Sequence, residues 1–319
     1  MRALWLSDRT LRLVDDAREP APKPGEALIG VSLAGICNTD LELVKGYYPF
    51  SGIPGHEFVG RVVSAPGARD WEGRRVVGEI NLACGRCATC RAGRRTHCAR
   101  RTVLGIRGCD GAFAERLVLP VANLHAVPDR VLDEAAVFAE PLAAALEVLE
   151  QVSVTAEQRV VVVGAGKLGA LVAQVLALTG CQLTVVARGA ASPPPPLRRL
   201  GVPMVSADAA PIGAADVVVD CTGTPEGFAV SRRAVRPRGT LVLKSTYRGP
   251  TPVDLAALVV DEISLIGSRC GPLGKALEVL EQGEVEVASL IEERYPLAQA
   301  LAAFEHAGRP GALKLLIRP

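Results

Sequence analysis

The amino-acid sequence predicts an α/β protein of two domains, one mainly of β-strands and the other a doubly wound parallel sheet. The chain has 319 residues, which is too long for one typical domain and sufficient for two. Its first 140 residues consist of short apolar runs between turn residues, whereas beyond about Pro141 strand-like and helix-like patterns alternate. This change of pattern predicts a strand-rich domain followed by a layered α/β domain.

The strand-rich region contains short runs of Val, Leu and Ile at residues 27–33, 58–64 and 75–78, with Gly, Pro and charged residues between them. Such runs predict strands joined by turns. Near the other end of the chain, residues 297–306 have the apolar spacing of a helix and residues 314–317 form a short apolar strand.

The alternating region begins with helical spacing at residues 142–152 and a continuous apolar strand at residues 159–163. The elements expected after these are helices at residues 168–179 and 227–235 and strands at residues 183–187, 216–220, 240–244 and 263–266. Strands that are apolar throughout are typical of a parallel sheet with both faces covered by helices.

The composition is that of an ordinary globular protein, with 49% hydrophobic and 22% charged residues. A formal net charge of +2 and 4% aromatic residues argue against a nucleic-acid or anionic membrane partner. The N-terminal residues show no secretory signal, and no stretch approaches the roughly 20 apolar residues of a membrane helix. The nine cysteines are an odd number in a long chain, which favours reduced thiols and a cytoplasmic location.

Four of these cysteines form a cluster with the spacing C-x2-C-x2-C-x7-C: Cys84, Cys87, Cys90 and Cys98. Four thiolates are a preferred tetrahedral ligand set for zinc, and such a set leaves no open position for substrate. The alternative, a run of ordinary free cysteines, does not account for four within fifteen residues. The cluster therefore predicts a structural zinc site.

A nucleotide-binding motif follows the Val-rich strand, in the run Gly164-Ala165-Gly166-Lys167-Leu168-Gly169. A G-x-G-x-x-G sequence between a strand and a helix is the Rossmann fingerprint, in which the helix N-terminus receives a pyrophosphate. We therefore expect the cofactor contacts of this loop from Gly164, Gly166, Lys167, Leu168 and Gly169.

The end of the next strand bears on the choice of cofactor. NAD-dependent enzymes place Asp or Glu there for the ribose hydroxyls, whereas this chain has Arg188 and no carboxylate. Because an arginine can pair with a 2′-phosphate, the sequence favours NADP(H) over NAD(H). Arg198 and Arg199 are further candidates or surface residues, and Arg269 could contact a phosphate or the substrate, or lie on the surface.

A second group of metal-binding residue types is dispersed along the chain. Its parts are Cys37-Asn38-Thr39-Asp40, Gly55-His56-Glu57 and Glu140-Pro141. Each alone is weak, since a single Cys or His is more often a core residue. Together, in this order and with the cysteine cluster and glycine-rich loop, they resemble the zinc-containing medium-chain alcohol and polyol dehydrogenases, with sorbitol, threonine and glucose dehydrogenases most similar.

The resemblance implies a catalytic zinc, and hence two zinc ions per chain. Cys37 and His56 would be ligands, Glu57 and Glu140 would share the remaining contacts, and Asp40 would orient His56. Zinc lowers the pKa of an alcohol that binds to it, and a hydride then passes to the nicotinamide. Thr39 matches the hydroxyl that takes the alcohol proton, while Glu42, in place of a relay histidine, is either a general base or a solvated helix residue.

The resemblance also implies an organisation and a reaction. A GroES-like catalytic domain would comprise residues 1–143 and 284–319 with the zinc loop 84–98, and a Rossmann domain residues 144–283. The expected function is zinc-dependent hydride transfer between a secondary alcohol (a polyol, sugar or amino alcohol) and NAD(P), in a homodimer or homotetramer. The alternatives are a zinc-independent quinone or enoyl reductase of the same superfamily and a non-catalytic zinc-ribbon protein.

Overall fold

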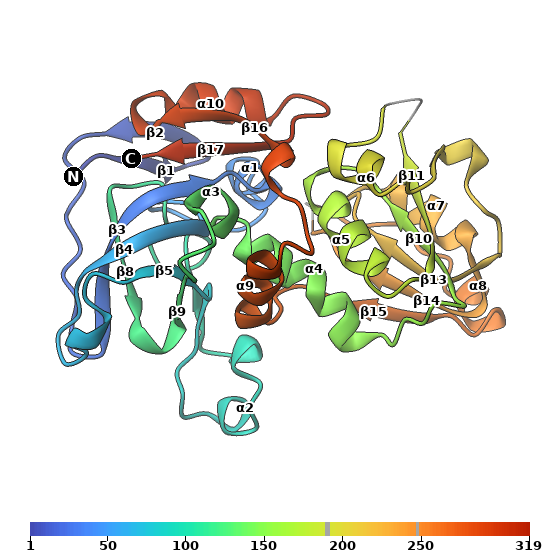
Figure 1. Cartoon of the computed structure of the whole chain (residues 1–319), viewed down its shortest axis with the longest axis horizontal. Helices are drawn as coiled ribbons and strands as arrows, with labels where there is room; N and C mark the ends of the chain where they lie inside the picture. The colour runs from blue at the N-terminus through green and yellow to red at the C-terminus, as the bar shows by residue number, and fades with distance from the viewer. Residues whose placement is uncertain (189–191, 247–248) are drawn as a thin grey trace. The chain divides into compact units, whose positions relative to one another are not determined.

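The computed structural model describes residues 1–188, 192–246 and 249–319, and the chain forms two compact units (Figure 1). The first unit contains Met1–Glu140, Leu273–Gln282 and Ile291–Pro319, and the second contains Pro141–Pro272 and Gly283–Leu290. These boundaries differ from the expected ones chiefly at residues 273–282. That segment forms a helix that packs on a short helix of the first unit.

The first unit is mainly β. Its strands are β1 (Ala3–Ser7), β2 (Thr10–Val14), β3 (Glu26–Gly35), β4 (Glu57–Ser64), β5 (Arg75–Gly78), β6 (Asn81–Leu82), β7 (Thr102–Val103), β8 (Arg116–Pro120), β9 (Leu124–Ala126), β16 (Ile291–Pro296) and β17 (Lys314–Arg318). Its helices are α1 (Asn38–Val44), α2 (Ala88–Arg91), α3 (Asp133–Ala136), α9 (Leu273–Gln282) and α10 (Ala300–Ala307).

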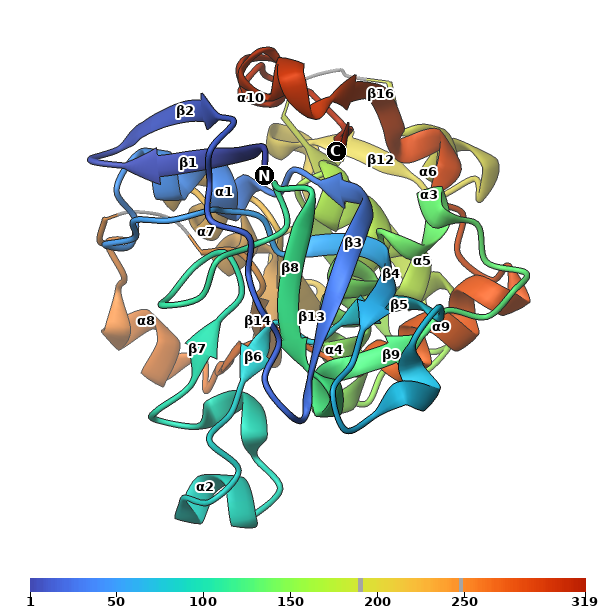
Figure 2. The same ribbon diagram turned by 90° about the vertical axis from the view of Figure 1, so that its left-hand side faces the viewer.

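The main sheet of this unit joins segments from both halves of the sequence. Its strand order is β16-β17-β3-β4-β5-β9, with β8 paired to β3 (Figure 2). The C-terminal strand β17 lies antiparallel to β3, with Leu316 opposite Gly35. On the other side of β3, Gly35 is opposite Glu57 at the start of β4. The ends of three strands therefore meet at one place.

The second unit is a parallel sheet with helices. Its strands are β10 (Arg159–Val163), β11 (Gln182–Ala187), β12 (Met204–Ser206), β13 (Ala215–Asp220), β14 (Val235–Leu243) and β15 (Ser264–Gly267). Its helices are α5 (Lys167–Ala177), α6 (Pro195–Arg199), α7 (Pro225–Ala234) and α8 (Leu255–Val260), together with most of α4 (Ala139–Gln151), which carries the chain from the first unit into the second.

The strand order β12-β11-β10-β13-β14-β15 confirms the predicted doubly wound fold. The chain runs outward from β10 to one edge, returns to the centre at β13 and runs outward to the other edge. Val161, Val186 and Val218 belong to the apolar cluster under this sheet, as expected for strands that are buried on both faces. None of the helices formed by the described residues has the length and apolar character needed to cross a membrane.

Candidate metal centres and cofactor site

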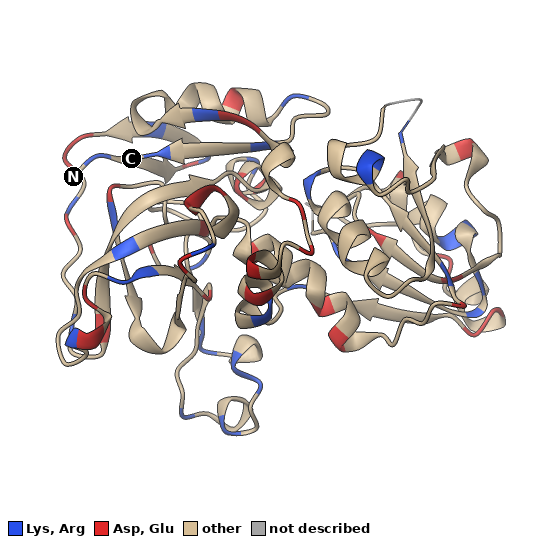
Figure 3. Cartoon of the chain, in the orientation of Figure 1, with Lys and Arg blue, Asp and Glu red and all other residues tan. Residues whose placement is uncertain are grey.

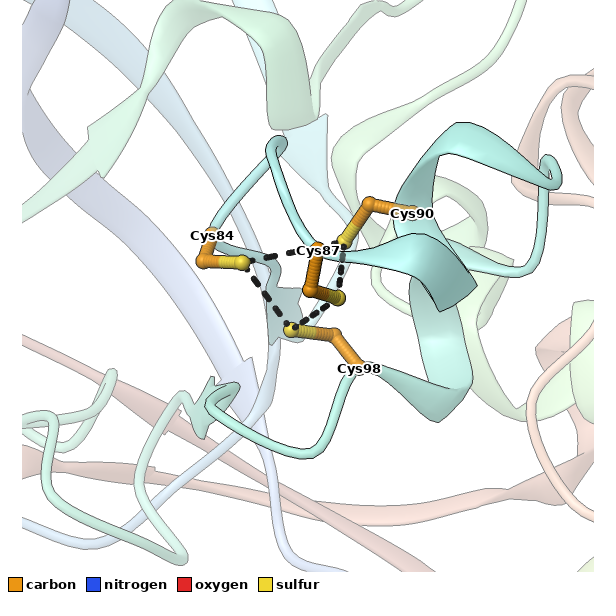
Figure 4. A group of neighbouring side chains, drawn as sticks. All are labelled: Cys84, Cys87, Cys90 and Cys98. Atoms are coloured by element: carbon orange, nitrogen blue, oxygen red, sulfur yellow. Dashed lines mark hydrogen bonds between the residues drawn. The ribbon is translucent and has the colours of Figure 1, made fainter.

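The four clustered cysteines converge in a loop around α2, which we call the cysteine lobe (residues 84–98; Figure 4). Neighbouring sulfur atoms lie 3.4 Å (Cys87–Cys90), 3.5 Å (Cys84–Cys98), 3.8 Å (Cys87–Cys98) and 4.0 Å (Cys84–Cys90) apart. A tetrahedron with zinc–sulfur bonds of about 2.3 Å has edges of about 3.8 Å. These distances are far longer than the roughly 2.05 Å of a disulfide, so the sulfurs fit a zinc ion.

Local donors and charges favour a thiolate at Cys84. The backbone N–H of Arg86, together with the side chain of Arg100, whose Nη2 donates to Cys84 Sγ at 3.3 Å, lowers the pKa of Cys84 to about 5. Residues 81–109 contain no Asp or Glu, and Figure 3 shows basic residues along the loop around α2. The positive charges of these basic residues compensate the negative charge of a four-thiolate site.

A second group of metal donors forms where β3 ends and β4 begins. The donor atoms of Cys37, His56 and Glu57 all lie within 4.8 Å of one another, and we call these three residues the buried centre. Cys37 caps α1 after the end of β3, and its backbone N–H donates to Asp40 Oδ2 at 2.8 Å. The antiparallel pairing of β3 with β4 brings His56 and Glu57 beside it.

His56 is buried against Asp40. Its Nδ1 lies 3.2 Å from Asp40 Oδ1, although the two atoms are not aligned for a hydrogen bond. Burial opposes protonation of the ring, but Asp40 and Cys37 together outweigh it and raise the pKa of His56 well above its usual value. With Nδ1 facing the carboxylate, Nε2 remains for a metal ion, an arrangement typical of metal-ligating histidines.

Glu57 has a partner that the sequence did not indicate. Lys314 Nζ on β17 forms an ion pair with Glu57 Oε2, and the two side chains are only 3% and 1% exposed. Burial lowers the pKa of Lys314, but the charge of Glu57 and nearby acids outweighs this and raises it. A side chain at Gly35 would clash with Glu57, so glycine leaves room for the pair.

The other oxygen of Glu57 supports metal binding. Glu57 Oε1 is buried and accepts no hydrogen bond from the described residues. A buried carboxylate oxygen without a partner is costly, and a metal ion shared with Cys37 and His56 would satisfy it. A thiolate, an imidazole and a carboxylate oxygen are all zinc ligands, so the buried centre fits zinc and leaves a fourth position for another ligand.

The remaining predicted catalytic residues lie at different places in the first unit. Thr39 Oγ1 is 3.7 Å from Cys37 Sγ, beside the buried centre. Glu42 lies one turn further along α1, where its Oε1 pairs with Lys45 Nζ at 2.8 Å. Glu140, at the start of α4, lies outside the group of donors formed by the buried centre among the described residues.

The glycine-rich loop joins β10 to α5 in the second unit. Gly164 has a positive φ of 106°, which favours glycine. A Cβ at Gly169 would clash with the carbonyl oxygen of Gly164, whereas a Cβ at Gly166 would meet nothing within 4 Å. Thus Gly169 permits close packing of helix on strand, and Gly166 borders open space beside the α5 N-terminus, where Lys167 and Leu168 begin the helix.

The arginines predicted near the cofactor have different environments. Arg188 directly follows β11, is exposed, and has no ion pair within the described part of the chain. Arg199 pairs with Glu286 at 3.3 Å, and Arg198 donates to the carbonyl of Pro193 at 3.2 Å. Arg269 follows β15, and its carbonyl oxygen accepts a hydrogen bond from Lys244 at 2.7 Å.

Comparison with known proteins agrees with this arrangement. Residues 23–129 match the alcohol dehydrogenase GroES-like domain. The chain is 31% identical to L-threonine 3-dehydrogenase of Streptomyces avermitilis, with 98% of this chain and 95% of that protein aligned.

Two solved structures are similar over the whole chain. A zinc-binding dehydrogenase from Sinorhizobium meliloti 1021 bound to NADP has a TM-score of 0.87 at 29% identity, with 100% of this chain and 99% of that one covered. A cobalt- and zinc-bound thermostable alcohol dehydrogenase from Pyrobaculum aerophilum has a TM-score of 0.89 at 30% identity, with the same coverage.

Proposed function

Because the chain belongs to the zinc-type medium-chain alcohol and polyol dehydrogenases, we propose that it catalyses reversible oxidation of a secondary alcohol by a nicotinamide cofactor. The chain is an oxidoreductase with a GroES-like domain and a Rossmann domain. The convergence of Cys37, His56 and Glu57, with Glu57 Oε1 left unsatisfied, is the observation that carries the proposal. The expected substrates are polyols, sugars and amino alcohols.

We assign the residues of the buried centre as ligands of a catalytic zinc. Bound zinc supplies Lewis acidity toward the substrate hydroxyl. Cys37, His56 and Glu57 hold the ion, and Asp40 fixes the orientation of the His56 ring. Thr39, beside Cys37, is placed to accept the hydroxyl proton.

The proton must then leave Thr39. Glu42 is on the same helix, but its carboxylate is already paired with Lys45 and is only 20% exposed. We therefore propose Glu42 as an acceptor that works only when Lys45 swings away. Glu42→Gln should lower turnover if this is correct, and should leave turnover unchanged if Glu42 is a surface residue.

The second unit binds the nicotinamide dinucleotide through the loop after β10, and we propose a preference for NADP(H). The support is Arg188, the one arginine of the three candidates at the β11 end that has no protein partner among the described residues. Arg188→Asp should then reverse the preference, as measured by kcat/KM with both cofactors. A more than tenfold preference of the unmodified enzyme for NAD(H) would contradict the proposal.

We also propose that the chain forms a homo-oligomer through the β15 edge of its sheet. Three of the four residues of β15 are exposed, and α8 buries none of its residues. Leu255, Val259 and Val260 are 68%, 75% and 78% exposed. An exposed apolar edge strand is a liability unless it is covered. Val259→Glu should therefore yield monomers by light scattering, whereas Leu301→Glu, at an exposed position of the other unit, should not.

A cytoplasmic location is proposed on the chemistry of the cysteines. All nine are free thiols in the structure, and thiols persist in reducing compartments. Mass spectrometry of thiols alkylated in intact cells tests this, since a disulfide found under those conditions would contradict it.

The central experiment is an assay of polyols, sugars and amino alcohols with both cofactors. Alcohol oxidation should disappear after dialysis against a chelator and return with zinc. Activity that survives complete metal removal, with an enoyl or quinone substrate reduced instead, would favour the zinc-independent reductase. Failure to bind either cofactor would favour a non-catalytic zinc-ribbon protein.

A further inference from the structure

Lys244 is a buried positive charge in the second unit that the reaction described above does not use. It directly follows β14 and is only 6% exposed. Its Nζ donates to Ser268 Oγ at 3.0 Å and to the carbonyl oxygen of Arg269 at 2.7 Å. Burial of an ammonium group costs free energy, so the buried position of Lys244 requires an explanation.

The strand order places Lys244 in one half of the cofactor site. A doubly wound sheet binds a dinucleotide across the carboxyl ends of its strands, with one mononucleotide over each half. The half formed by β10, β11 and β12 carries the glycine-rich loop and the position that recognises the adenosine ribose. The other half, β13-β14-β15, therefore receives the nicotinamide, and Lys244 stands at the carboxyl end of its middle strand.

Lys244 also determines the shape of the backbone at this end of the sheet. The two hydrogen bonds from its Nζ tie the end of β14 to residues 268–269 after β15. The backbone N–H of Ser268 donates to the carbonyl of Leu243 at 2.9 Å. A side chain at Gly271 would clash with the carbonyl oxygen of Ala143 on α4. The loop is thus held on two sides, by Lys244 and by α4.

Two acidic residues lie near Lys244 in the fold. Glu147 on α4 lies against Gly271. Burial raises its pKa, and the charge of Lys244 acts in the opposite direction. Asp220, at the end of β13, is largely buried and is occupied by hydrogen bonds from Thr222 N–H and Oγ1. Glu147 is therefore an acidic group whose charge interacts with that of Lys244.

We propose that Lys244 positions the loop after β15 against the nicotinamide and makes this half of the site bind the reduced cofactor more tightly than the oxidised one. The proposal rests on the cofactor binding inferred above. The oxidised nicotinamide ring carries a positive charge and the reduced ring is neutral, so a buried ammonium beside the ring repels only the oxidised form. The bound equilibrium then shifts toward the reduced cofactor and the carbonyl, that is, toward alcohol oxidation, while the overall equilibrium in solution is unchanged.

The test measures the dissociation constants of oxidised and reduced cofactor with the zinc-loaded protein. Lys244→Met keeps the unbranched stem and removes the charge. It should weaken binding of the reduced cofactor about tenfold, and should lower the preference for reduced over oxidised cofactor by roughly three- to tenfold. Lys244→Arg retains the charge and should largely retain the preference.

A second variant should change the preference for reduced cofactor in the opposite direction, and it leaves Lys244 in place. Glu147→Gln removes the offsetting charge and should raise the preference for the reduced cofactor by roughly threefold. This variant decides the question if Lys244→Met does not fold.

Two results would overturn the inference: an equal loss of both affinities in Lys244→Met, which indicates a purely structural lysine, or an unchanged preference in Glu147→Gln. These differ from failure of the proposed function, in which the unmodified protein binds neither cofactor or oxidises no alcohol.

Discussion

The cysteine lobe and the buried centre are two groups of metal-donor side chains that are built differently within one unit. The lobe takes its four donors from fifteen consecutive residues, and two of its four cysteines are partly exposed, in a loop rich in arginines. The buried centre takes its donors from two neighbouring strand ends and depends on Asp40 and Lys314 for charge balance. A closed local site can only stabilise its loop, whereas a buried site with an open position can bind substrate.

The largest expected effect is a loss of enzymatic activity when the buried centre is changed and the cysteine lobe is left intact. Cys37→Ser should abolish measurable turnover while the protein stays folded, because it removes a ligand from the buried centre without touching the lobe. Steady-state kinetics, zinc content and circular dichroism on the same sample check this. Cys181→Ser, at a partly buried cysteine outside both sites, serves as the control and should remain active.

The next effect is on stability. Cys98→Ser opens the four-thiolate set, and loss of a structural metal is among the few changes that cost about 4–5 kcal/mol or more. Calorimetry should show a lower unfolding temperature. Metal analysis should show a loss of one zinc per chain. A stable Cys98→Ser protein together with an active Cys37→Ser protein would show that the two roles are assigned wrongly.

Breaking the ion pair at the buried centre should cost less stability than opening the four-thiolate set. A second substitution should restore the lost stability. Lys314→Met leaves Glu57 buried without its cation, which costs about 3–5 kcal/mol in comparable pairs. Metal-free protein should lose more stability than zinc-loaded protein, because zinc can replace the missing charge. Adding Glu57→Gln should restore stability to the metal-free form, and equal losses with and without zinc would contradict the role given to Glu57.

The smallest effect is expected at the residue that orients a ligand. Asp40→Asn keeps the shape of the side chain but weakens its hold on His56, so zinc affinity or turnover should fall about 10- to 100-fold. A competitive chelator titration measures the affinity. Asp70→Asn, on an exposed turn of the same unit, is the matched control, and an Asp40→Asn protein that behaves like it would remove Asp40 from the site.

The sequence predicted the features that depend on local spacing. The cysteine lobe and the glycine-rich loop each lie within one short segment, so their residue types and intervals were sufficient. The doubly wound sheet followed from strands that are apolar throughout. The change of pattern near Pro141 lies where the chain passes from the first unit to the second.

Features formed by residues far apart in the sequence could not be predicted from local spacing. Lys314 meets Glu57 across 257 residues, and the only signal was a lysine within an apolar strand. The sequence did not indicate that Arg199 pairs with Glu286, which lies 87 residues further along the chain. No role for Lys244 could be predicted from the sequence either, because only the folded sheet brings Ser268 and Glu147 near it.

The pairing of β17 with β3 has a consequence for the order of events during synthesis. Domains generally fold as the chain emerges from the ribosome, N-terminal part first, so the cysteine lobe can acquire its metal early. Cys37, His56 and Glu57 are made early as well, but the lysine that balances Glu57 follows it by 257 residues. A nascent chain would therefore hold the three donors long before their charge is compensated, and the buried centre would be complete only after β17 has been made.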